Sequence, residues 1–272
     1  MTASSTDRAF AGSIPQLYDK YLVPLIFEPY AADLAERVRA LAPQRVLEIA
    51  AGTGVVTRRL AEVLGRDTSI VASDLNPPML EHARALGTAR PVEWRQADAM
   101  ALPFADASFD AVVCQFGVMF FPHKAAAFAE ARRVLRPGGT LLFNVWDRLE
   151  ANDFADTVTA ALAGRYPADP PRFLARTPHG YCDTDAIARD LAHGGFVARP
   201  ASDTVARRSR ADTPAAPAFA YCEGTPLRGE IEARDRSGLA EATEQAAQAI
   251  ARRFGPGPVE GGLRAHVVTV AR

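Results

Sequence analysis

The stretch VLEIAAGTGVVTRRL, residues 46–60, decides the fold of this chain. An apolar run that carries one acid, Glu48, leads into the small-residue turn AAGTG at residues 50–54, and helix-like sequence follows at once. A second apolar run, SIVASDL, ends on Asp74 and Leu75. This order predicts a strand, a glycine-rich turn, a helix and a second strand that ends on an acid. In nucleotide-binding α/β folds such a turn lets the backbone approach a ligand closely, and the acid holds the ribose hydroxyls.

The turn departs from the dinucleotide-binding fingerprint, because the third glycine of G-x-G-x-x-G would fall at Thr57. The arrangement of Glu48, Gly52 and Gly54 instead resembles the first motif of class I S-adenosylmethionine-dependent methyltransferases, an acid followed by three glycines at alternate positions. Ala50 replaces the first of those glycines. Its methyl group still permits backbone contact with a ligand but leaves less room.

The downstream sequence extends this resemblance. The pair Asp98-Ala99, the stretch LPFADASFD at residues 102–110 and the turn RVLRPGG at residues 133–139 are similar to the ubiquinone/menaquinone-type (methyltransferase type 11) group. The match covers residues 41–147, and residues 10–27 are similar to the openings of that group. The resemblance implies S-adenosylmethionine as the cofactor. It also implies a Rossmann-like α/β fold: a doubly wound, seven-stranded, mostly parallel sheet whose last strand is antiparallel and lies between the fifth and sixth.

Alternation of strand-like and helix-like segments independently predicts a parallel doubly wound sheet. The predicted strands share short apolar runs and cover residues 45–49, 69–73, 92–96, 110–115 and 140–145. The predicted helices between them cover residues 55–64, 77–86 and 125–135.

The two ends of the chain depart from this alternation. At the N-terminus we predict a helix at residues 16–22, breaks at Pro24 and Pro29, and a helix at residues 30–41. Beyond Asp147 we predict, in chain order, a helix at 154–164, a Pro-rich loop at 168–181, a helix at 184–193, a strand at 196–207, mostly helical sequence at 212–254 and a final strand at 263–270.

Three regions follow from these elements. Residues 1–40 are expected to form an N-terminal helical lid, and residues 41–147 the cofactor-binding Rossmann-like core. Residues 148–272 would complete the sheet and carry a helical acceptor-binding insertion at about 208–258. An oligomer interface, such as that of a homodimer, is the alternative role for those helices.

Composition narrows the classes of partner. A net charge of −1 over 272 residues gives no basic footprint for nucleic acid. The sequence contains no apolar stretch of 18 residues, so no membrane span is predicted. The first residues lack the basic segment and apolar core of a signal peptide. We therefore expect a cytoplasmic protein. Cys114, Cys182 and Cys222 are far apart and form no C-x-x-C pair, so no metal site is expected.

The resemblance assigns parts of the cofactor to particular residues. The amino-acid tail would lie against the turn, where amides at a helix start favour a carboxylate. Asp74 would hold the ribose, Asp98 the adenine amino group and the Ala99 amide a ring nitrogen. The full set of expected cofactor-binding residues is Tyr18, Glu48, Ala50, Gly52, Thr53, Gly54, Asp74, Leu75, Met79, Asp98, Ala99 and Gln115.

Each assignment has a structural alternative. The glycines could form a turn without a ligand, and Asp74 could be the N-cap of the next helix, for which Asn76 is equally suited. Asp98 could be a plain turn residue. Met79 could belong to the core, and Tyr18 could pack its own helix instead of closing over the cofactor.

Methyl transfer is an in-line displacement from a sulfonium whose leaving group is already activated, so alignment and desolvation can supply much of the catalysis. A base is needed only if the nucleophile must lose a proton. His123 and His179 are the candidates for that base. We therefore predict methyl transfer to a small-molecule acceptor through an oxygen, nitrogen or carbon atom. An NAD(P)-dependent oxidoreductase and a non-catalytic cofactor-binding module are the alternatives.

Overall fold

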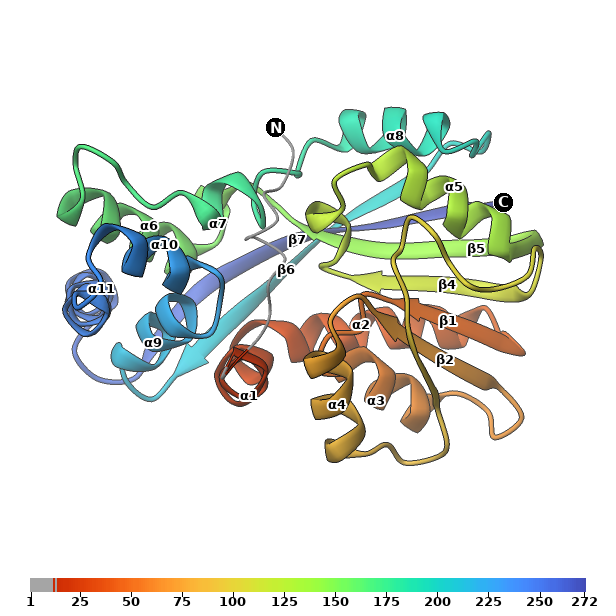
Figure 1. Cartoon of the computed structure of the whole chain (residues 1–272), viewed down its shortest axis with the longest axis horizontal. Coiled ribbons are helices and arrows are strands. Elements are labelled where there is room, and N and C mark those ends of the chain that lie inside the picture. Colours follow the sequence, from red (N-terminus) through yellow and green to blue (C-terminus); the bar gives the residue numbers. More distant parts are fainter. Residues whose placement is uncertain (1–11, 13) are drawn as a thin grey trace.

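A seven-stranded sheet forms the centre of the molecule, which is described by a computed structural model that covers residue 12 and residues 14–272. The strand order is β3-β2-β1-β4-β5-β7-β6. Strand β7 is antiparallel to both β5 and β6, and the other neighbouring strands are parallel. The predicted doubly wound sheet, with its last strand between the fifth and sixth, is therefore confirmed (Figure 1). The strands are β1 Arg45–Ile49, β2 Ser69–Asp74, β3 Glu93–Gln96, β4 Phe109–Gln115, β5 Leu135–Trp146, β6 Ala201–Ala211 and β7 Val259–Ala271.

The central strands are buried on both faces, as their nearly continuous apolar sequences require. In β1 the parallel register pairs Ile49 with Ser73 of β2, and Val46 with Ala111 of β4. The carboxyl ends of these three strands therefore meet at one edge of the sheet. The residues that follow each strand come together there although they are distant in the sequence.

Helices cover the two faces of the sheet. Figure 1 shows α2 Glu28–Ala40, α3 Val55–Val63 and α4 Pro77–Leu86 on one side, and α5 Lys124–Val134 and α8 Thr184–His193 on the other. Each helix turns an apolar stripe inward, as the burial of Ile187 and Leu191 on α8 shows.

A group of helices gathers beyond the carboxyl ends of the strands (Figure 1). Helix α11 packs against α9 and α6, and α9 packs against the N-terminal helix η2. The predicted insertion and the N-terminal helices thus lie together over the edge where ligands of such sheets bind. The group consists of η2 Tyr18–Phe27, α6 Asp153–Arg165, α7 Phe173–Arg176, α9 Ala215–Glu223, α10 Leu227–Arg234 and α11 Leu239–Phe254.

The N-terminal helix does not break at its prolines, so that prediction was wrong. The chain is helical from α1, Ile14–Leu17, through η2 and into α2. Pro24 lies inside η2, which has π-helical geometry, and the amide of Glu28 donates to the carbonyl of Val23 five residues earlier. This wider turn accommodates the ring that an α-helix would exclude. Pro29 lies in the first turn of α2, where proline is tolerated.

Several other boundaries differ from the predictions. The Pro-rich loop contains the single helical turn α7, and the insertion divides into three helices. Strand β6 begins at Ala201, beyond Pro200, because the pairing with β7 begins there and continues to Ala211. Strand β5 already begins at Leu135, which pairs with Phe109 ahead of an irregularity in β4.

A buried acid lies in the middle of β1. Glu48 is 1% exposed, and the hydroxyl of Thr57 on α3 donates to its Oε2 atom over 2.5 Å. Burial raises the pKa of Glu48 to about 8. The folded protein therefore keeps this carboxyl protonated at pH values where the unfolded chain has lost the proton.

We expect Glu48→Gln to remove a pH dependence of stability. In the wild type this raised pKa makes the free energy of unfolding fall as pH rises from 4.5 to 8, by at most about 1.4 kcal/mol per pH unit. Urea denaturation at several pH values should show the Gln variant gaining stability relative to the wild type as pH rises through this window. The control is Glu81→Gln, at an exposed position on α4. A difference between Glu48→Gln and wild type that is constant with pH would contradict the raised pKa.

Candidate active site

A cavity opens at the carboxyl ends of β1, β2 and β4 and encloses about 740 Å³, part of it open to solvent. Most of the predicted cofactor-binding residues meet in its wall. Those that line it are Tyr18, Ala50, Gly52, Asp74, Leu75, Met79, Asp98, Ala99 and Gln115. We call this space the first cavity.

The turn between β1 and α3 presents its backbone to the first cavity at Gly52. The φ angle of Gly52 is +56°, a value that favours glycine, and a Cβ atom placed there would meet only Met79 Cε, 4.0 Å away. Gly54, with φ +81°, is packed instead, because its Cβ would fall 3.0 Å from Trp94. Gly52 therefore leaves room for a ligand, whereas Gly54 lets α3 begin close to its neighbours.

Asp74 ties the turn to the end of β2. Its side chain is buried, Oδ2 accepts a hydrogen bond from the amide of Gly52 over 2.8 Å, and Oδ1 accepts one from the amide of Asn76 over 2.8 Å. Asn76, not Asp74, is the N-cap residue of α4. Burial raises the pKa of Asp74 against the lowering effect of these amides. Asn76 Nδ2 also donates to Oδ1 over 3.3 Å. Because a carboxylate offers about four lone pairs, Asp74 can still accept a hydrogen bond from a ligand.

The loop after β3 supplies a second acceptor and a donor. Asp98 Oδ1 accepts from the amide of Met100 over 2.9 Å, so Asp98 does shape the turn, and its other oxygen remains for a ligand. In the described part of the chain the amide of Ala99 donates to no protein group. Met79, which is buried, and Leu75, which is 40% exposed, provide apolar surface to the same space.

Three of the expected residues do not line the first cavity, and their direct contact with a cofactor stays a prediction. Glu48 lies behind the turn and bonds to Thr57. Thr53 is 1% exposed, and within the described residues its hydroxyl has no hydrogen-bond partner. Gly54 packs against Trp94.

Residues after β4 complete the wall, and sequence reasoning missed them. Phe116 has a φ of +50°, its amide donates to Asn144 Oδ1 over 2.9 Å, and its ring stacks on Trp146 with centroids 3.7 Å apart. The signal was present in the segment FGVMFFP, where a glycine and three aromatic rings follow a buried strand. The missed lining residues are Asn76, Ala97, Phe116, Gly117, Phe120, Phe121 and Pro122.

A second cavity of about 560 Å³ adjoins the first. Tyr18, Phe116 and Phe120 line both cavities. Of the described residues that line the second cavity, none is charged and most are apolar or aromatic. The others in its wall are Leu22, Ile26, Phe27, Trp146, Asn152, Phe173, Leu174, Pro178, His179, Tyr221 and Thr225.

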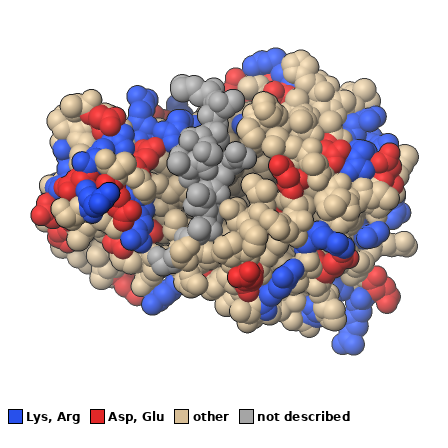
Figure 2. Space-filling view, in the orientation of Figure 1, with Lys and Arg blue, Asp and Glu red and all other residues tan. Residues whose placement is uncertain are grey.

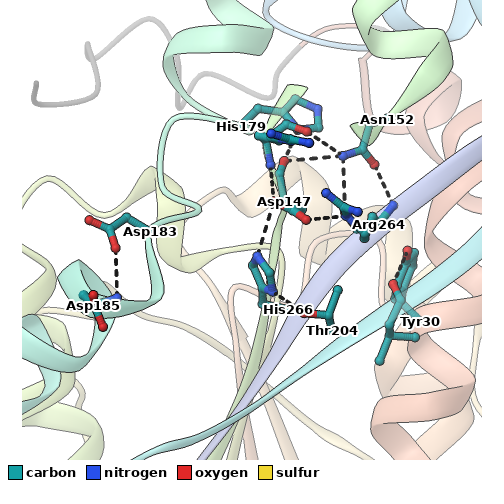
Figure 3. A network of polar contacts seen from close by, with 11 residues as sticks. Tyr30, Asp147, Asn152, His179, Asp183, Asp185, Thr204, Arg264 and His266 are labelled. Atoms are coloured by element: carbon teal, nitrogen blue, oxygen red, sulfur yellow. Dashed lines mark hydrogen bonds and ion pairs between the residues drawn. The ribbon is translucent and has the colours of Figure 1, made fainter. Parts of the chain in front are cut away.

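His179 lies in the wall of the second cavity, above the end of β5 (Figure 3). It is 7% exposed, and its Nδ1 atom lies 2.8 Å from the backbone oxygen of Asp147. Burial lowers the pKa of His179 to about 4, so the ring is neutral near pH 7. The other candidate base, His123, is exposed at the start of α5 and lines neither cavity.

The carboxylate of Asp147 holds β7 beside the end of β5. Its Oδ2 accepts from Arg264 Nε over 2.5 Å, and its Oδ1 lies 3.3 Å from His266 Nε2. Asn152 donates to the backbone oxygens of Asp147 and Arg264. Figure 3 shows His179 and His266 on opposite sides of Asp147. The carbonyl that His179 faces is thus fixed from several directions.

On the face in Figure 2, basic and acidic side chains of the described residues are intermixed. Within residues 14–272, no helix has both the length and the apolar character needed to cross a bilayer. The same residues contain no group of three His, Cys, Asp or Glu side chains that could hold a metal ion.

The strand order, and a cavity at the turn between β1 and α3, define the class I S-adenosylmethionine-dependent methyltransferase fold. Residues 47–143 match a family model described as a methyltransferase domain. A demethylmenaquinone methyltransferase of Thermus thermophilus is 43% identical over 189 residues, which are 62% of this chain and 84% of that protein. The chain belongs to the class I methyltransferases, in the ubiquinone/menaquinone biosynthesis group. The membership inferred from the sequence motifs is confirmed.

Other relatives are matched over smaller parts. The ubiquinone/menaquinone biosynthesis C-methyltransferase UbiE of Ectopseudomonas mendocina is 34% identical, and the match spans 56% of this chain and 64% of that protein. The match thus spans less than two thirds of that relative. Among solved structures, a phosphoethanolamine N-methyltransferase of Haemonchus contortus, with S-adenosylhomocysteine bound, has a TM-score of 0.58 at 17% identity. That match covers 98% of this chain and 59% of the other, and it shows the shared fold.

Ala50 stands at the first glycine position of the motif, and its methyl group has room only because residue 117 is glycine. A Cβ atom at position 117 would fall 2.5 Å from Ala50 Cβ and 2.7 Å from Cys114 Sγ. We expect Gly117→Ala to lower the free energy of unfolding by about 1–3 kcal/mol. Ala50→Gly should recover part of that loss, since it removes one of the two clashes.

Urea denaturation of the two single variants and the double variant measures this coupling as a double-mutant cycle. Gly164→Ala is the control, because a Cβ there meets no atom within 4 Å. Strictly additive effects at positions 50 and 117 would show that the two sites do not contact each other in the way described.

Proposed function

We propose that this protein binds S-adenosylmethionine in the first cavity and transfers its methyl group to a small, uncharged, mainly apolar molecule in the second. The observation that carries this proposal is the shared wall of Tyr18, Phe116 and Phe120. A donor and an acceptor bound on the two sides of this junction would be neighbours. Both would be enclosed by helices η2, α7 and α9.

The residues of the first cavity suit the parts of the cofactor. The open backbone at Gly52 leaves room for the amino-acid tail, and Asp74 can accept from the ribose hydroxyls. Asp98 can accept from the amino group of adenine, and the Ala99 amide can donate to a ring nitrogen. When bound, S-adenosylmethionine supplies a methyl group on a sulfonium. The chain's own contribution is to align the acceptor with that methyl and to exclude water.

The alternatives lack comparable support. A nicotinamide-dependent oxidoreductase would use a third glycine where this chain has Thr57. A module that only binds the cofactor would not need a second, adjoining apolar cavity. The names of the relatives indicate carbon methylation of a quinone precursor, and an apolar cavity with Phe and Trp rings could hold an aromatic ring of that kind. The atom that is methylated here is left open.

We further propose that residues 166–254 and the N-terminal helical segment form the acceptor pocket and its lid. Side chains from η2, from the segment around α7 and from the end of α9 line the second cavity. Part of the expected lid, residues 1–11 and 13, lies outside the described residues. A cytoplasmic location and a homodimer remain predictions from the sequence.

Asp74→Ala should weaken binding of S-adenosylhomocysteine by about 10- to 100-fold, because a charged acceptor contributes roughly 1.5–3 kcal/mol. Isothermal titration measures the dissociation constant, and a cooperative thermal transition establishes that the variant is folded. Asp74→Asn keeps an acceptor for the Gly52 amide and should lose less affinity. Asp67→Ala, at an exposed position, is the control. Unchanged affinity in folded Asp74→Ala, or tighter binding of NAD than of S-adenosylhomocysteine by the wild type, would end the cofactor assignment.

Hydrogen exchange tests the lid. Amides of η2, α7 and α9 should exchange more slowly when S-adenosylhomocysteine and an acceptor are both bound, because the acceptor touches all three elements. Helices α3 and α5 serve as internal references and should change little. If exchange slows equally across the whole sheet, or nowhere in the three elements, the helices are better explained as an oligomer interface.

A further inference from the structure

We propose that the first turns of η2, residues 18–23, are a gate over the first cavity, and that Asp19 is the latch that keeps this gate closed. The inference rests on the proposed function and adds to it a residue that controls how fast the cofactor enters and leaves. Three features of the described structure carry it: η2 is anchored at one end, has a wide turn in its middle, and is held by an ion pair at the other end.

The carboxyl end of η2 is anchored to the sheet. Ser209 Oγ on β6 donates to the carbonyl of Leu25 over 2.8 Å. Gln115 Nε2, at the end of β4, donates to the carbonyl of Phe27 over 3.3 Å. Residues 25–27 are also buried in the core. Because packed cores resist displacement, this end of the helix stays in place when its other end moves.

The wide turn of η2 separates the anchored end from the gate. Pro24 has no amide proton, so the helix lacks a backbone hydrogen bond at this residue. The next amide beyond the turn, that of Glu28, reaches the carbonyl of Val23 with π-helical spacing. Helices bend at prolines and at π-helical turns. Residues 18–23 can therefore move about this point while residues 25–27 stay in the core.

Asp19 attaches the amino end of η2 to the turn after β1. Its Oδ1 atom lies 3.3 Å from Arg58 Nη2 on α3, and Arg58 Nη1 donates to the carbonyl of Thr53 over 2.6 Å. One guanidinium group thus joins the helix to the turn that carries Gly52. The side chains of Asp19 and Arg58 are 19% and 26% exposed, so solvent screens this pair less than a fully exposed one.

Two weaker contacts accompany this ion pair. His82 Nε2 on α4 lies 3.7 Å from Asp19 Oδ2, which is too long for a hydrogen bond, and within the described residues this buried nitrogen has no hydrogen-bond partner. Tyr21 meets Phe219 of α9 edge-on, with centroids 4.9 Å apart. Loss of the Asp19 charge would therefore release the gate without removing an aromatic ring from its wall.

The latch lies next to the residue that closes the cavity. Tyr18 lines both cavities, and its ring stacks on Phe27 with centroids 4.9 Å apart. Burial, followed by the carboxylates of Asp74 and Asp19, raises the pKa of Tyr18, so its hydroxyl is close to both acids. Movement of Asp19 away from Arg58 would carry Tyr18 away from the Asp74 end of the first cavity.

This arrangement has a kinetic consequence. Asp19, Arg58 and His82 all belong to the chain, and none of them lines the first cavity. The latch therefore stabilises the closed gate with or without a cofactor, and it slows entry and release alike. A residue that touches the cofactor would slow release alone.

Surface plasmon resonance on the immobilised full-length protein tests the gate with S-adenosylhomocysteine. We expect Asp19→Asn to raise both the association and the dissociation rate constant by about 3- to 30-fold, as for loss of a half-buried ion pair. The Kd should stay within about threefold of the wild type, because both rate constants move together. Asp19→Glu should recover part of the change. Glu28→Gln, which removes an exposed carboxylate at the other end of η2, is the matched control.

Hydrogen exchange of the ligand-free protein tests the latch independently. In Asp19→Asn the amides of residues 18–23 should exchange about 3- to 30-fold faster, whereas those of residues 25–27 should match the wild type. In an Arg58→Gln background the same Asp19→Asn change should have a much smaller effect, because the partner of the ion pair is already absent.

Unchanged rate constants and unchanged exchange in folded Asp19→Asn would overturn the proposal. A rise in the dissociation rate constant alone would also overturn it, since Asp19 would then support the bound cofactor and not a gate. If S-adenosylhomocysteine does not bind to the wild type, the proposed function fails, and exchange in the ligand-free protein still decides whether Asp19 holds residues 18–23 in place.

Discussion

The hydrogen bond between the Gly52 amide and the Asp74 carboxylate is the interaction on which the rest of the site depends. It joins the turn after β1 to the end of β2 over 2.8 Å. The parallel register of the two strands brings Ile49 level with Ser73, so the turn and the acid arrive at the same edge of the sheet. The same carboxylate lines the first cavity, so one residue both shapes the turn and can accept a hydrogen bond from a ligand. Backbone hydrogen bonds from Ala51 to Ser73 and from Gly54 to Ala51 hold the same turn, so Gly52 keeps its positive φ beside the first cavity.

The second cavity, which we propose as the acceptor site, is lined by packed aromatic rings and by no charged residue among those described. Phe116 leaves β4 in a left-handed conformation that the side chain of Asn144 supports, and its ring stacks on Trp146. Tyr30 meets both rings edge-on, with centroids 5.3 Å away, and donates to the carbonyl of Val205. These contacts link α2, the end of β4, the end of β5 and β6 around the second cavity. A rigid apolar wall of this kind excludes water from a reaction that gains mainly from alignment and desolvation.

Much of the fold, and part of the wall of the first cavity, could be predicted from the sequence, because both depend on local patterns. Short stretches of sequence are enough to predict three features: the alternation of strands and helices, the turn with Gly52, and the acid at Asp74. The continuous helix through Pro24 was not predicted, because the sequence pattern does not distinguish a proline that ends a helix from one inside a π-helical turn. Nor could the sequence show that Gly117 makes room for Ala50, or that His179 faces Asp147, because these pairs are brought together only by the completed sheet. Long-range contacts of this kind shape the second cavity, so its lining could not be predicted from the sequence.

A crystal structure with S-adenosylhomocysteine bound tests the central claim most directly, namely that donor and acceptor meet at the wall shared by the two cavities. We expect the ribose hydroxyls on Asp74 and the adenine beside Asp98 and Ala99. The sulfur should lie at the junction formed by Tyr18, Phe116 and Phe120. An acceptor or analogue in the same crystal should lie on the far side of that junction, within the second cavity. A ligand whose sulfur points away from the second cavity, or an adenine placed outside the loop after β3, would contradict the account.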